Sequence, residues 1–208
     1  NFFILDHKAK INFITSILDN LYPNPEIPLF HTNNFTFLVA VMLSAQSTDK
    51  KVNEITPNLF NKADTPEKMV QLSVDEIKQI IRQIGLAPTK AKNIRRMSEL
   101  LISKHKGLVP SSFSSLEELP GVGHKTASVI MSQAFNQPAF PVDTHIHRLA
   151  YRWGLSNGKN VIQTEKDLKE KFDKKIWNKL HLQIIFYGRE FCQAKKTECL
   201  CRICQAIK

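Results

Sequence analysis

Four cysteines are the clearest candidates for chemistry in this sequence, because all of them lie in one short stretch near its carboxyl end. They are Cys192, Cys199, Cys201 and Cys204, and the rest of the chain has none. A disulfide framework would distribute cysteines to link distant segments, whereas this crowding is typical of a metal or iron–sulfur site. Four thiolates also suffice for a tetrahedral zinc ion, and free thiols without any metal are the third interpretation.

A glycine-rich turn forms the second candidate site. Gly121 and Gly123 flank Val122 after a Leu-Pro pair, and His124 and Lys125 follow at once. Glycines let the backbone turn tightly and leave its N–H groups open to an anion such as a DNA phosphate. The pattern predicts a helix–hairpin–helix that binds phosphate through residues 121–124, although an ordinary turn between helices can have the same glycine spacing.

Lys125 falls in the first turn of the helix expected after this hairpin. The positive end of the helix macrodipole disfavours a protonated amine there, and a neutral lysine amine is a nucleophile. The alternative is a surface lysine that only contacts phosphate.

Asp143 begins a further amphipathic helix, within the sequence Pro-Val-Asp-Thr-His. Most aspartates at such an N-cap position are structural. If Asp143 also faced Lys125, it would supply a carboxylate for proton transfer or charge stabilisation. His124, His145 and His147 do not form a metal-binding pattern with a nearby carboxylate, and we interpret His145 as structural.

The charge of the chain favours a polyanionic partner. Lys and Arg outnumber Asp and Glu by 29 to 19, which gives a formal net charge of +10 and a pI near 9.5. A generically basic surface is the alternative. No apolar run approaches the roughly 20 residues needed to span a bilayer, and no secretory signal opens the sequence. We therefore expect no membrane association and a location in the cytoplasm, at the nucleoid.

These candidate sites need helices to position them, and the sequence favours helices throughout. Asn33 and Asn34 can cap a segment that is apolar nearly all round, which predicts a central buried helix. Ser115 with Glu118 marks the start of another helix. No sustained strand-like alternation appears. The fold is expected to be all-α, with helices over residues 7–21, 35–43, 48–60, 73–84 and 90–106.

Six segments, taken in order, resemble one known family. They are Leu43–Asp49, Ile84–Leu86, Lys90–Ile94, Leu119–Ala127, Val142–Ile146 and Gly158–Val161. The family is the helix–hairpin–helix, Gly-Pro-Asp superfamily of DNA glycosylases, and within it endonuclease III. Together the segments cover the chain almost from end to end.

The resemblance implies a bifunctional DNA glycosylase and abasic-site lyase of base excision repair that removes oxidised pyrimidines. Lys125 matches the nucleophile, which attacks C1′ of an everted nucleotide and forms a Schiff base that undergoes β-elimination. Asp143 matches the essential carboxylate. The implied partner is double-stranded DNA containing damaged bases or abasic sites, and the implied oligomeric state is a monomer.

The resemblance also gives roles to two loop residues. Gln46 would fill the gap left by the everted base, and Leu86 would act as an apolar wedge. Without the resemblance, Gln46 would be interpreted as a polar loop residue and Leu86 as a hydrophobic contact after a helix end.

The family fold implies two helical lobes with a DNA-binding cleft between them. Residues 27–137 would form a six-helix lobe with the hairpin, and residues 1–26 with 138–208 would form the lobe that carries the cysteines. Lys125 would come from the first lobe and Asp143 from the second.

The cysteine spacing departs from the family pattern. Endonuclease III holds a [4Fe–4S] cluster with the spacing C-x6-C-x2-C-x5-C, whereas this chain has C-x6-C-x-C-x2-C. Cys192 and Cys199 match, and Cys201 and Cys204 are displaced candidates. We expect a [4Fe–4S] cluster, with zinc or no metal as alternatives. Lys195 and Lys196, between the first two cysteines, match a basic loop that contacts phosphate, or are simply solvated.

Two other functions share these features. An adenine-mismatch glycosylase has the hairpin and the aspartate but lacks the lysine nucleophile, so Lys125 argues against it. A non-catalytic helix–hairpin–helix DNA-binding protein would use Lys125 and Asp143 only as a phosphate contact and a helix cap.

Overall fold

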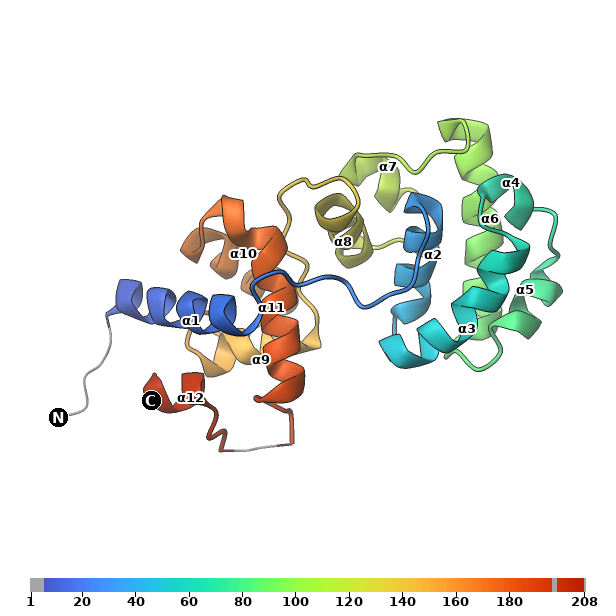
Figure 1. The fold of residues 1–208 in the computed structure, drawn as a ribbon. Helices are drawn as coiled ribbons and strands as arrows, with labels where there is room; N and C mark the ends of the chain where they lie inside the picture. Colours follow the sequence, from blue (N-terminus) through green and yellow to red (C-terminus); the bar gives the residue numbers. More distant parts are fainter. Residues whose placement is uncertain (1–5, 196–197, 208) are drawn as a thin grey trace. The chain divides into compact units, whose positions relative to one another are not determined.

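The computed structural model describes residues 6–195 and 198–207. The regular elements within these ranges are all helices, which confirms the all-α prediction (Figure 1). The chain forms two compact units. The hairpin unit is Pro28–Phe135, and the cysteine unit combines Asn1–Ile27 with Asn136–Lys208.

The hairpin unit is built around one buried helix, α2 (Asn34–Ser44), in which every residue from Phe35 to Leu43 is buried. This confirms the prediction of a central helix that is apolar nearly all round. Three helices of at least ten residues pack against α2, and three shorter helices complete the unit. The packing helices are α3 (Asp49–Lys62), α6 (Ala87–His105) and α8 (His124–Gln133), and the short ones are α4 (Pro66–Met69), α5 (Val74–Ile80) and α7 (Phe113–Glu117).

Several helix starts in this unit are set by the side chains that the sequence identifies. The Asn33 side chain accepts a hydrogen bond from the Thr36 backbone N–H, as a capping box for α2. Ser73 and Glu76 form a second capping box for α5. These side chains satisfy backbone donors that the first turn of a helix leaves unpaired.

Three helix boundaries differ from the sequence prediction by three residues or more. Helix α6 begins at Ala87 instead of residue 90, because Leu86 precedes it in the left-handed conformation. The N-cap of α7 is Ser112 instead of Ser115, and the Ser112 hydroxyl accepts from the Ser115 N–H. Helix α5 ends at Ile80, and a tighter turn occupies the last residues of the predicted helix.

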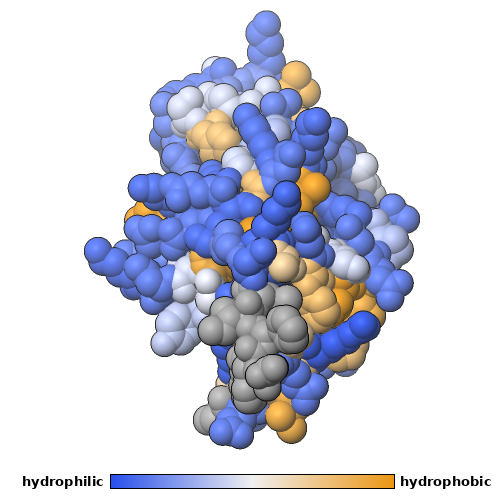
Figure 2. Space-filling model, turned by 90° about the vertical axis from the view of Figure 1, so that its left-hand side faces the viewer, coloured by the Kyte–Doolittle hydropathy of each residue, from blue (hydrophilic) through white to orange (hydrophobic). Residues whose placement is uncertain are grey.

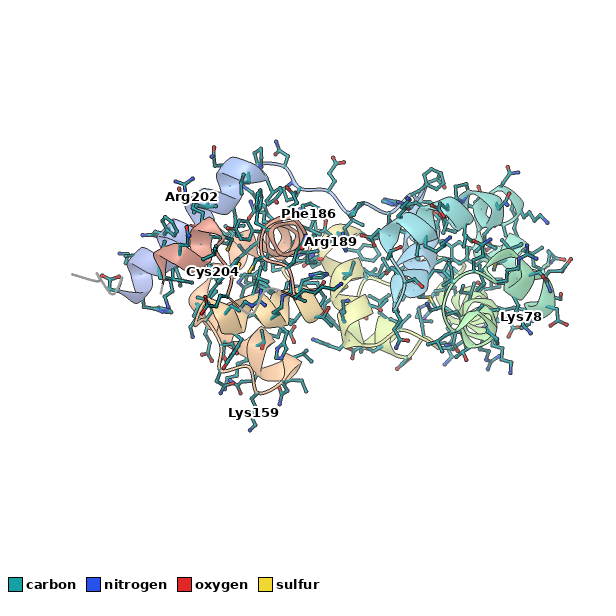
Figure 3. All side chains as sticks on the ribbon, turned by 90° about the horizontal axis from the view of Figure 1, so that it is seen from below. Lys78, Lys159, Phe186, Arg189, Arg202 and Cys204 are labelled. Carbon is teal, nitrogen blue, oxygen red and sulfur yellow. The ribbon has the colours of Figure 1, made fainter. Side chains whose placement is uncertain are left out.

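The cysteine unit joins segments from both ends of the chain. Helix α1 (His7–Leu21) packs against α11 (Trp177–Glu190) and α12 (Arg202–Ala206), and α11 also packs against α9 (Thr144–Arg152). Helix α10 (Val161–Lys171) and a 3₁₀ turn at Lys174–Ile176 complete it. Figure 3 shows Cys204 on α12 beside α1.

The core of this unit surrounds Trp153 and Tyr187, whose rings meet edge to face at 5.7 Å between centroids. Cys192, Cys199 and Cys204 belong to the same buried cluster. The cysteine site is thus continuous with the hydrophobic core.

No helix in the described part of the chain has both the length and the apolar character needed to cross a bilayer. Hydrophilic side chains predominate on the face drawn in Figure 2.

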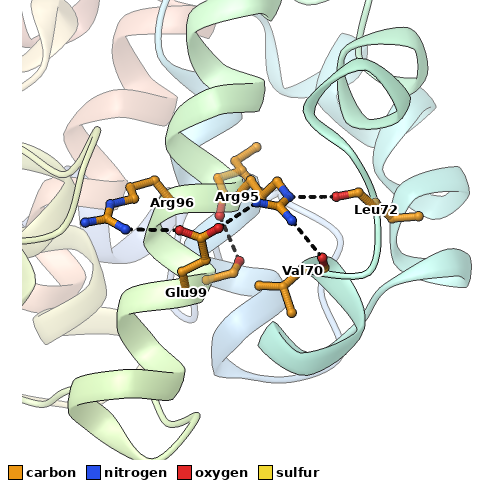
Figure 4. A network of polar contacts seen from close by, with 7 residues as sticks. Val70, Leu72, Arg95, Arg96 and Glu99 are labelled. Atoms are coloured by element: carbon orange, nitrogen blue, oxygen red, sulfur yellow. Dashed lines mark hydrogen bonds and ion pairs between the residues drawn. The ribbon is translucent and has the colours of Figure 1, made fainter.

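Arg95 on α6 holds the loop between α4 and α5 (Figure 4). Its guanidinium donates to the carbonyl oxygens of Val70 at 3.1 Å and Leu72 at 2.9 Å, and to the carboxylate of Glu99 at 2.6 Å. The neighbouring Arg96 donates to Glu99 at 3.1 Å and its side chain is 63% exposed, against 33% for Arg95.

Arg95→Ala should therefore lower the free energy of unfolding by about 1–2 kcal/mol, because two loop carbonyls lose a charged donor. Arg96→Ala is the matched control and should cost less than about 0.5 kcal/mol, as expected for an exposed ion pair. Denaturant titration of both variants measures the difference. Equal costs would show that the loop does not depend on Arg95.

Candidate functional site

The glycine-rich hairpin joins α7 to α8 with its apolar residues turned inward. Leu119 and Val122 are buried, and the Val122 N–H donates to the Leu119 carbonyl at 3.1 Å. Gly121 has a φ of +79°, the left-handed region that favours glycine. Because the Val122 side chain faces the core and its N–H closes the turn, the exposed part of the hairpin is Gly121 together with Gly123.

Gly123 is the N-cap of α8 and provides no side-chain cap. The positive end of the α8 macrodipole therefore adjoins an exposed, glycine-lined surface, which suits an anion.

His124 links the two helices of the hairpin. Its Nδ1 lies 2.9 Å from Oε1 of Glu117, and its ring stacks on Phe113 at 5.9 Å between centroids. The imidazole thus braces α8 against α7. Lys125 is the next residue, and it is exposed in the first turn of α8.

Asp143 is the N-cap of α9, as the sequence predicts. Its Oδ1 accepts from the Ile146 N–H at 2.8 Å, which fixes the carboxylate at the start of the helix. The residue is half-buried. Burial lowers the pKa of His181 to about 4, and the negative charge of Asp143 partly opposes this shift.

Gln46 and Leu86 lie on two loops that touch each other in the hairpin unit. Ala45 and Gln46 form a turn closed by the Ser47 N–H on the Ser44 carbonyl at 3.1 Å. A Cβ on Gly85, next to Leu86, would lie 3.6 Å from the Gln46 carbonyl oxygen.

Both residues have left-handed backbones, with φ of 58° at Gln46 and 60° at Leu86. Both are also exposed, and Leu86 leaves 57% of its surface in solvent. This exposure does not fit a hydrophobic contact. Non-glycine residues in such conformations concentrate at functional sites.

The four cysteines are brought together, including the two displaced ones. Their Sγ atoms all lie within 4.8 Å of one another, with Cys192 at 3.4 Å from Cys199 and 3.7 Å from Cys204. All four are free thiols, and three are buried. This donor set could hold a metal.

Backbone and arginine donors surround the sulfur atoms. Arg152 donates to Cys192 Sγ at 3.4 Å, and the Cys204 N–H donates to Cys201 Sγ at 3.4 Å. Hydrogen bonding from Cys204, followed by that from Arg152, lowers the pKa of Cys192 to about 5, while the same sulfur pairing raises the pKa of Cys204. A site that stabilises thiolate favours metal ligation.

The loop between the first two cysteines is tied to α9. Arg152 donates to the carbonyl oxygens of Gln193 at 3.0 Å and Ala194 at 3.3 Å. Lys195 follows on this loop and is exposed, whereas Lys196 lies outside the described residues.

Lys90 is a polar residue near Gln46 and Leu86 that the sequence patterns do not single out as functional. Lys90 is buried on the apolar face of α6 and donates to backbone carbonyls of the Gln46 turn. The available signal was its position, because it stands on the same face as Ala87, Ala91 and Ile94.

Comparisons with known proteins agree with this fold and these motifs. Residues 39–174 match the family described as HhH-GPD superfamily base excision DNA repair protein. The chain belongs to this superfamily.

The curated relatives narrow the assignment. Endonuclease III of Bacillus subtilis strain 168 is 41% identical over 191 residues, which cover 91% of this chain and 87% of the relative. Endonuclease III of Rickettsia conorii is 43% identical over 189 residues, covering 91% and 90%. The chain is therefore a member of the endonuclease III family, and its activity is that of a DNA glycosylase and abasic-site lyase in base excision repair.

Solved structures place the same family on DNA. A trapped endonuclease III–DNA covalent intermediate is 38% identical, with a TM-score of 0.89 over 97% of this chain and 98% of that one. A non-covalent endonuclease III–DNA complex is also 38% identical, with a TM-score of 0.90 over 97% of each chain. DNA binding follows for this chain as well.

The two hairpin glycines should respond differently to an added methyl group. A Cβ at Gly121 would meet Asn93 and Met42 at 3.0–3.1 Å and would impose a left-handed alanine, so Gly121→Ala should cost about 1–3 kcal/mol of stability. A Cβ at Gly123 meets nothing within 4 Å, so Gly123→Ala should keep stability within about 1 kcal/mol.

Gly123→Ala should instead weaken duplex binding by about 1 kcal/mol, because its methyl group would obstruct the approach of a phosphate to the first N–H groups of α8. Thermal unfolding and fluorescence anisotropy separate the two effects. Unchanged DNA affinity in a folded Gly123→Ala variant would exclude a phosphate contact at this turn.

Proposed function

We propose that this enzyme removes oxidised pyrimidines from duplex DNA and cleaves the resulting abasic site, with Lys125 as nucleophile and Asp143 as the assisting carboxylate. The main support is one observation: the hairpin ends directly at an exposed Lys125, in a chain similar along 97% of its length to a trapped covalent endonuclease III–DNA intermediate.

Lys125 must lose its proton before it reacts, because an ammonium has no lone pair. Its Nζ then bonds to C1′ of the everted nucleotide while the C1′–N bond breaks and the base leaves with the bonding electrons and a proton. The nitrogen then forms a double bond to C1′ while the C1′–O4′ bond breaks and O4′ takes up a proton, which opens the sugar to a protonated Schiff base. Removal of a C2′ proton then expels the 3′ phosphate by β-elimination.

Asp143 acts at the stage where the positive charge develops. Its carboxylate, oriented by the Ile146 N–H, stabilises the cationic sugar and accepts a proton from the attacking amine. An N-cap carboxylate keeps a second oxygen available for this role.

Gln46 and Leu86 serve the eversion of the nucleotide. Leu86 enters the base stack as an apolar wedge, and Gln46 occupies the vacated position opposite the unpaired base. Their exposure on adjacent loops supports these roles.

The partner is double-stranded DNA with damaged bases or abasic sites, bound by a monomer in the cytoplasm at the nucleoid. Phosphate contacts come from Gly121, Gly123 and His124 through the backbone, with Val122 shaping the turn. Lys195 and Lys196 add salt-dependent contacts from the loop before Cys199.

Borohydride trapping tests the assigned chemistry. Wild-type protein should form a covalent adduct with a thymine-glycol duplex or an abasic duplex, and Lys125→Ala should reduce that adduct by at least about 10³-fold. Asp143→Asn should retain DNA binding but trap much more slowly.

Lys104→Ala, which removes an exposed lysine at the end of α6, is the control. Absence of an adduct with wild-type protein would favour a non-catalytic DNA-binding protein. Release of adenine from a mismatch without trapping would favour the mismatch glycosylase.

The four cysteines are proposed to hold a [4Fe–4S] cluster. The support is the family resemblance together with four sulfur donors gathered in a partly buried site. Bound there, the cluster would supply a redox-capable crosslink that ties α12 to α11. Arg152 and the Cys204 N–H would donate to the sulfur ligands, which favours retention of the cluster.

Zinc is a second candidate, favoured by the short sulfur separations. Four bonds of about 2.3 Å around one tetrahedral ion place the sulfurs about 3.8 Å apart. The 3.4 and 3.7 Å separations are close to this value. A four-iron cube is larger and would require the thiols to move apart.

Metal analysis and visible absorption of the purified protein decide between these candidates. A cluster should give a broad visible band and about four irons per chain, and Cys201→Ser should bleach it and lower the unfolding temperature. A colourless protein with one zinc per chain would replace the cluster by zinc. Protein without either metal would leave the cysteines as free thiols.

A further inference from the structure

Lys90 is a buried lysine whose backbone belongs to the first turn of α6, next to Leu86, and whose side chain bonds to the end of α2, next to Gln46. It is 7% exposed and lies four residues into α6. Its Nζ donates to the carbonyl oxygens of Leu43 at 3.0 Å and Ala45 at 2.5 Å. Its backbone N–H donates to the Leu86 carbonyl at 2.9 Å. The bond to Leu86 is the ordinary first backbone bond of α6, whereas the two bonds from the Lys90 side chain tie this helix to the end of α2 and to the residue that precedes Gln46.

These bonds complete the carboxyl end of α2. The last carbonyls of a helix have no partner within it and carry its negative dipole. Helix α2 has no basic residue in its own last turn. Lys90 supplies the missing positive charge from α6.

The ammonium group is held for this structural contact and not for nucleophilic attack. Burial lowers the pKa of Lys90, but two carbonyl oxygens accept from its Nζ and occupy the position that a substrate would need. A neutral amine would lose the attraction to the helix end.

The loops that carry Gln46 and Leu86 both contain a residue in an unfavourable left-handed conformation. Gln46 and Leu86 each keep a left-handed backbone while their side chains stand in solvent. Without support, such residues relax to other conformations, and ordering them again on DNA would oppose eversion. Leu86 is anchored as the N-cap of α6, and the Lys90 ammonium fastens the turn of Gln46 to the same helix, which opposes this relaxation.

We propose that Lys90 is a positioning residue that preorganises Gln46 and Leu86 as one unit for the eversion of the damaged nucleotide. The inference rests on the proposed function, because it presumes that these two side chains enter the DNA.

The test compares Lys90→Met with Lys104→Met, which removes the same charge from an exposed position on the same helix. Single-turnover base release from a thymine-glycol duplex should slow on the order of tenfold in Lys90→Met. Eversion, followed by the fluorescence of 2-aminopurine next to the lesion, should slow by a similar factor. Lys104→Met should match wild type in both.

A double-mutant cycle separates positioning from general stability. In a Gln46→Ala, Leu86→Ala background, Lys90→Met should slow base release by less than about twofold, because the side chains through which it acts are gone. An undiminished tenfold effect in that background would overturn the proposal.

Three further outcomes keep the test decisive. If Lys90→Met does not fold, Lys90→Gln, which retains one amide donor, should show an intermediate loss that the same background removes. If Gln46→Ala and Leu86→Ala themselves release base at the wild-type rate, the assigned eversion roles fail. If they slow release but Lys90→Met and Lys90→Gln do not, only the Lys90 inference fails.

Discussion

Helix ends impose the constraint on which the candidate sites depend. Each end leaves backbone groups without a partner inside the helix, and those groups must be satisfied by a side chain, a turn or a ligand. Gln46 follows the end of α2, Leu86 precedes α6, and Asp143 caps α9. Lys125 lies in the first turn of α8, and Cys201 caps α12. The candidate sites are therefore concentrated where regular hydrogen bonding stops.

The helix ends are completed in different ways, and the difference matches the proposed roles. Asp143 supplies its own cap to α9 and thereby fixes its carboxylate. Gly123 supplies no side-chain cap to α8, which keeps the dipole available to an anion. The end of α2 is completed by Lys90 from another helix. A capped end positions a side chain, whereas an end without a side-chain cap can bind a ligand.

The sequence predicts the elements whose signals are local. The apolar run of α2, the capping box of Ser73 and the N-cap at Asp143 all depend on residues within a few positions of each other. The start of α6 was predicted too late because a left-handed leucine at position 86 has no sequence signature. Ser112 and Ser115 are chemically identical, so the side-chain type alone does not predict that Ser112 supplies the cap.

The difference between local and long-range contacts also decides which parts of the candidate sites the sequence predicts. The crowding of the cysteines predicts a shared site, but whether Cys201 and Cys204 reach it depends on how α12 folds back beside α11. Ile203 on α12 donates its N–H to the Tyr187 hydroxyl on α11 at 3.3 Å, which helps to hold this arrangement. The role of Lys90 could not be derived from spacing, because its carbonyl partners lie 45 and 47 residues away. Contacts at such separations depend on the packing of whole helices.

The left-handed backbones of Gln46 and Leu86 give a physical reason for a buried lysine at position 90. Glycine at positions 46 and 86 would remove a backbone cost of about 1–2 kcal/mol at each. It would also remove the two side chains that stand exposed on adjacent loops. The chain keeps both side chains, and the turn of Gln46 receives hydrogen bonds from the buried Lys90 ammonium, whose desolvation is itself unfavourable. Two left-handed residues and one buried charge are each unfavourable alone, and together they give an arrangement in which the turn of Gln46 is fastened to the helix that Leu86 precedes.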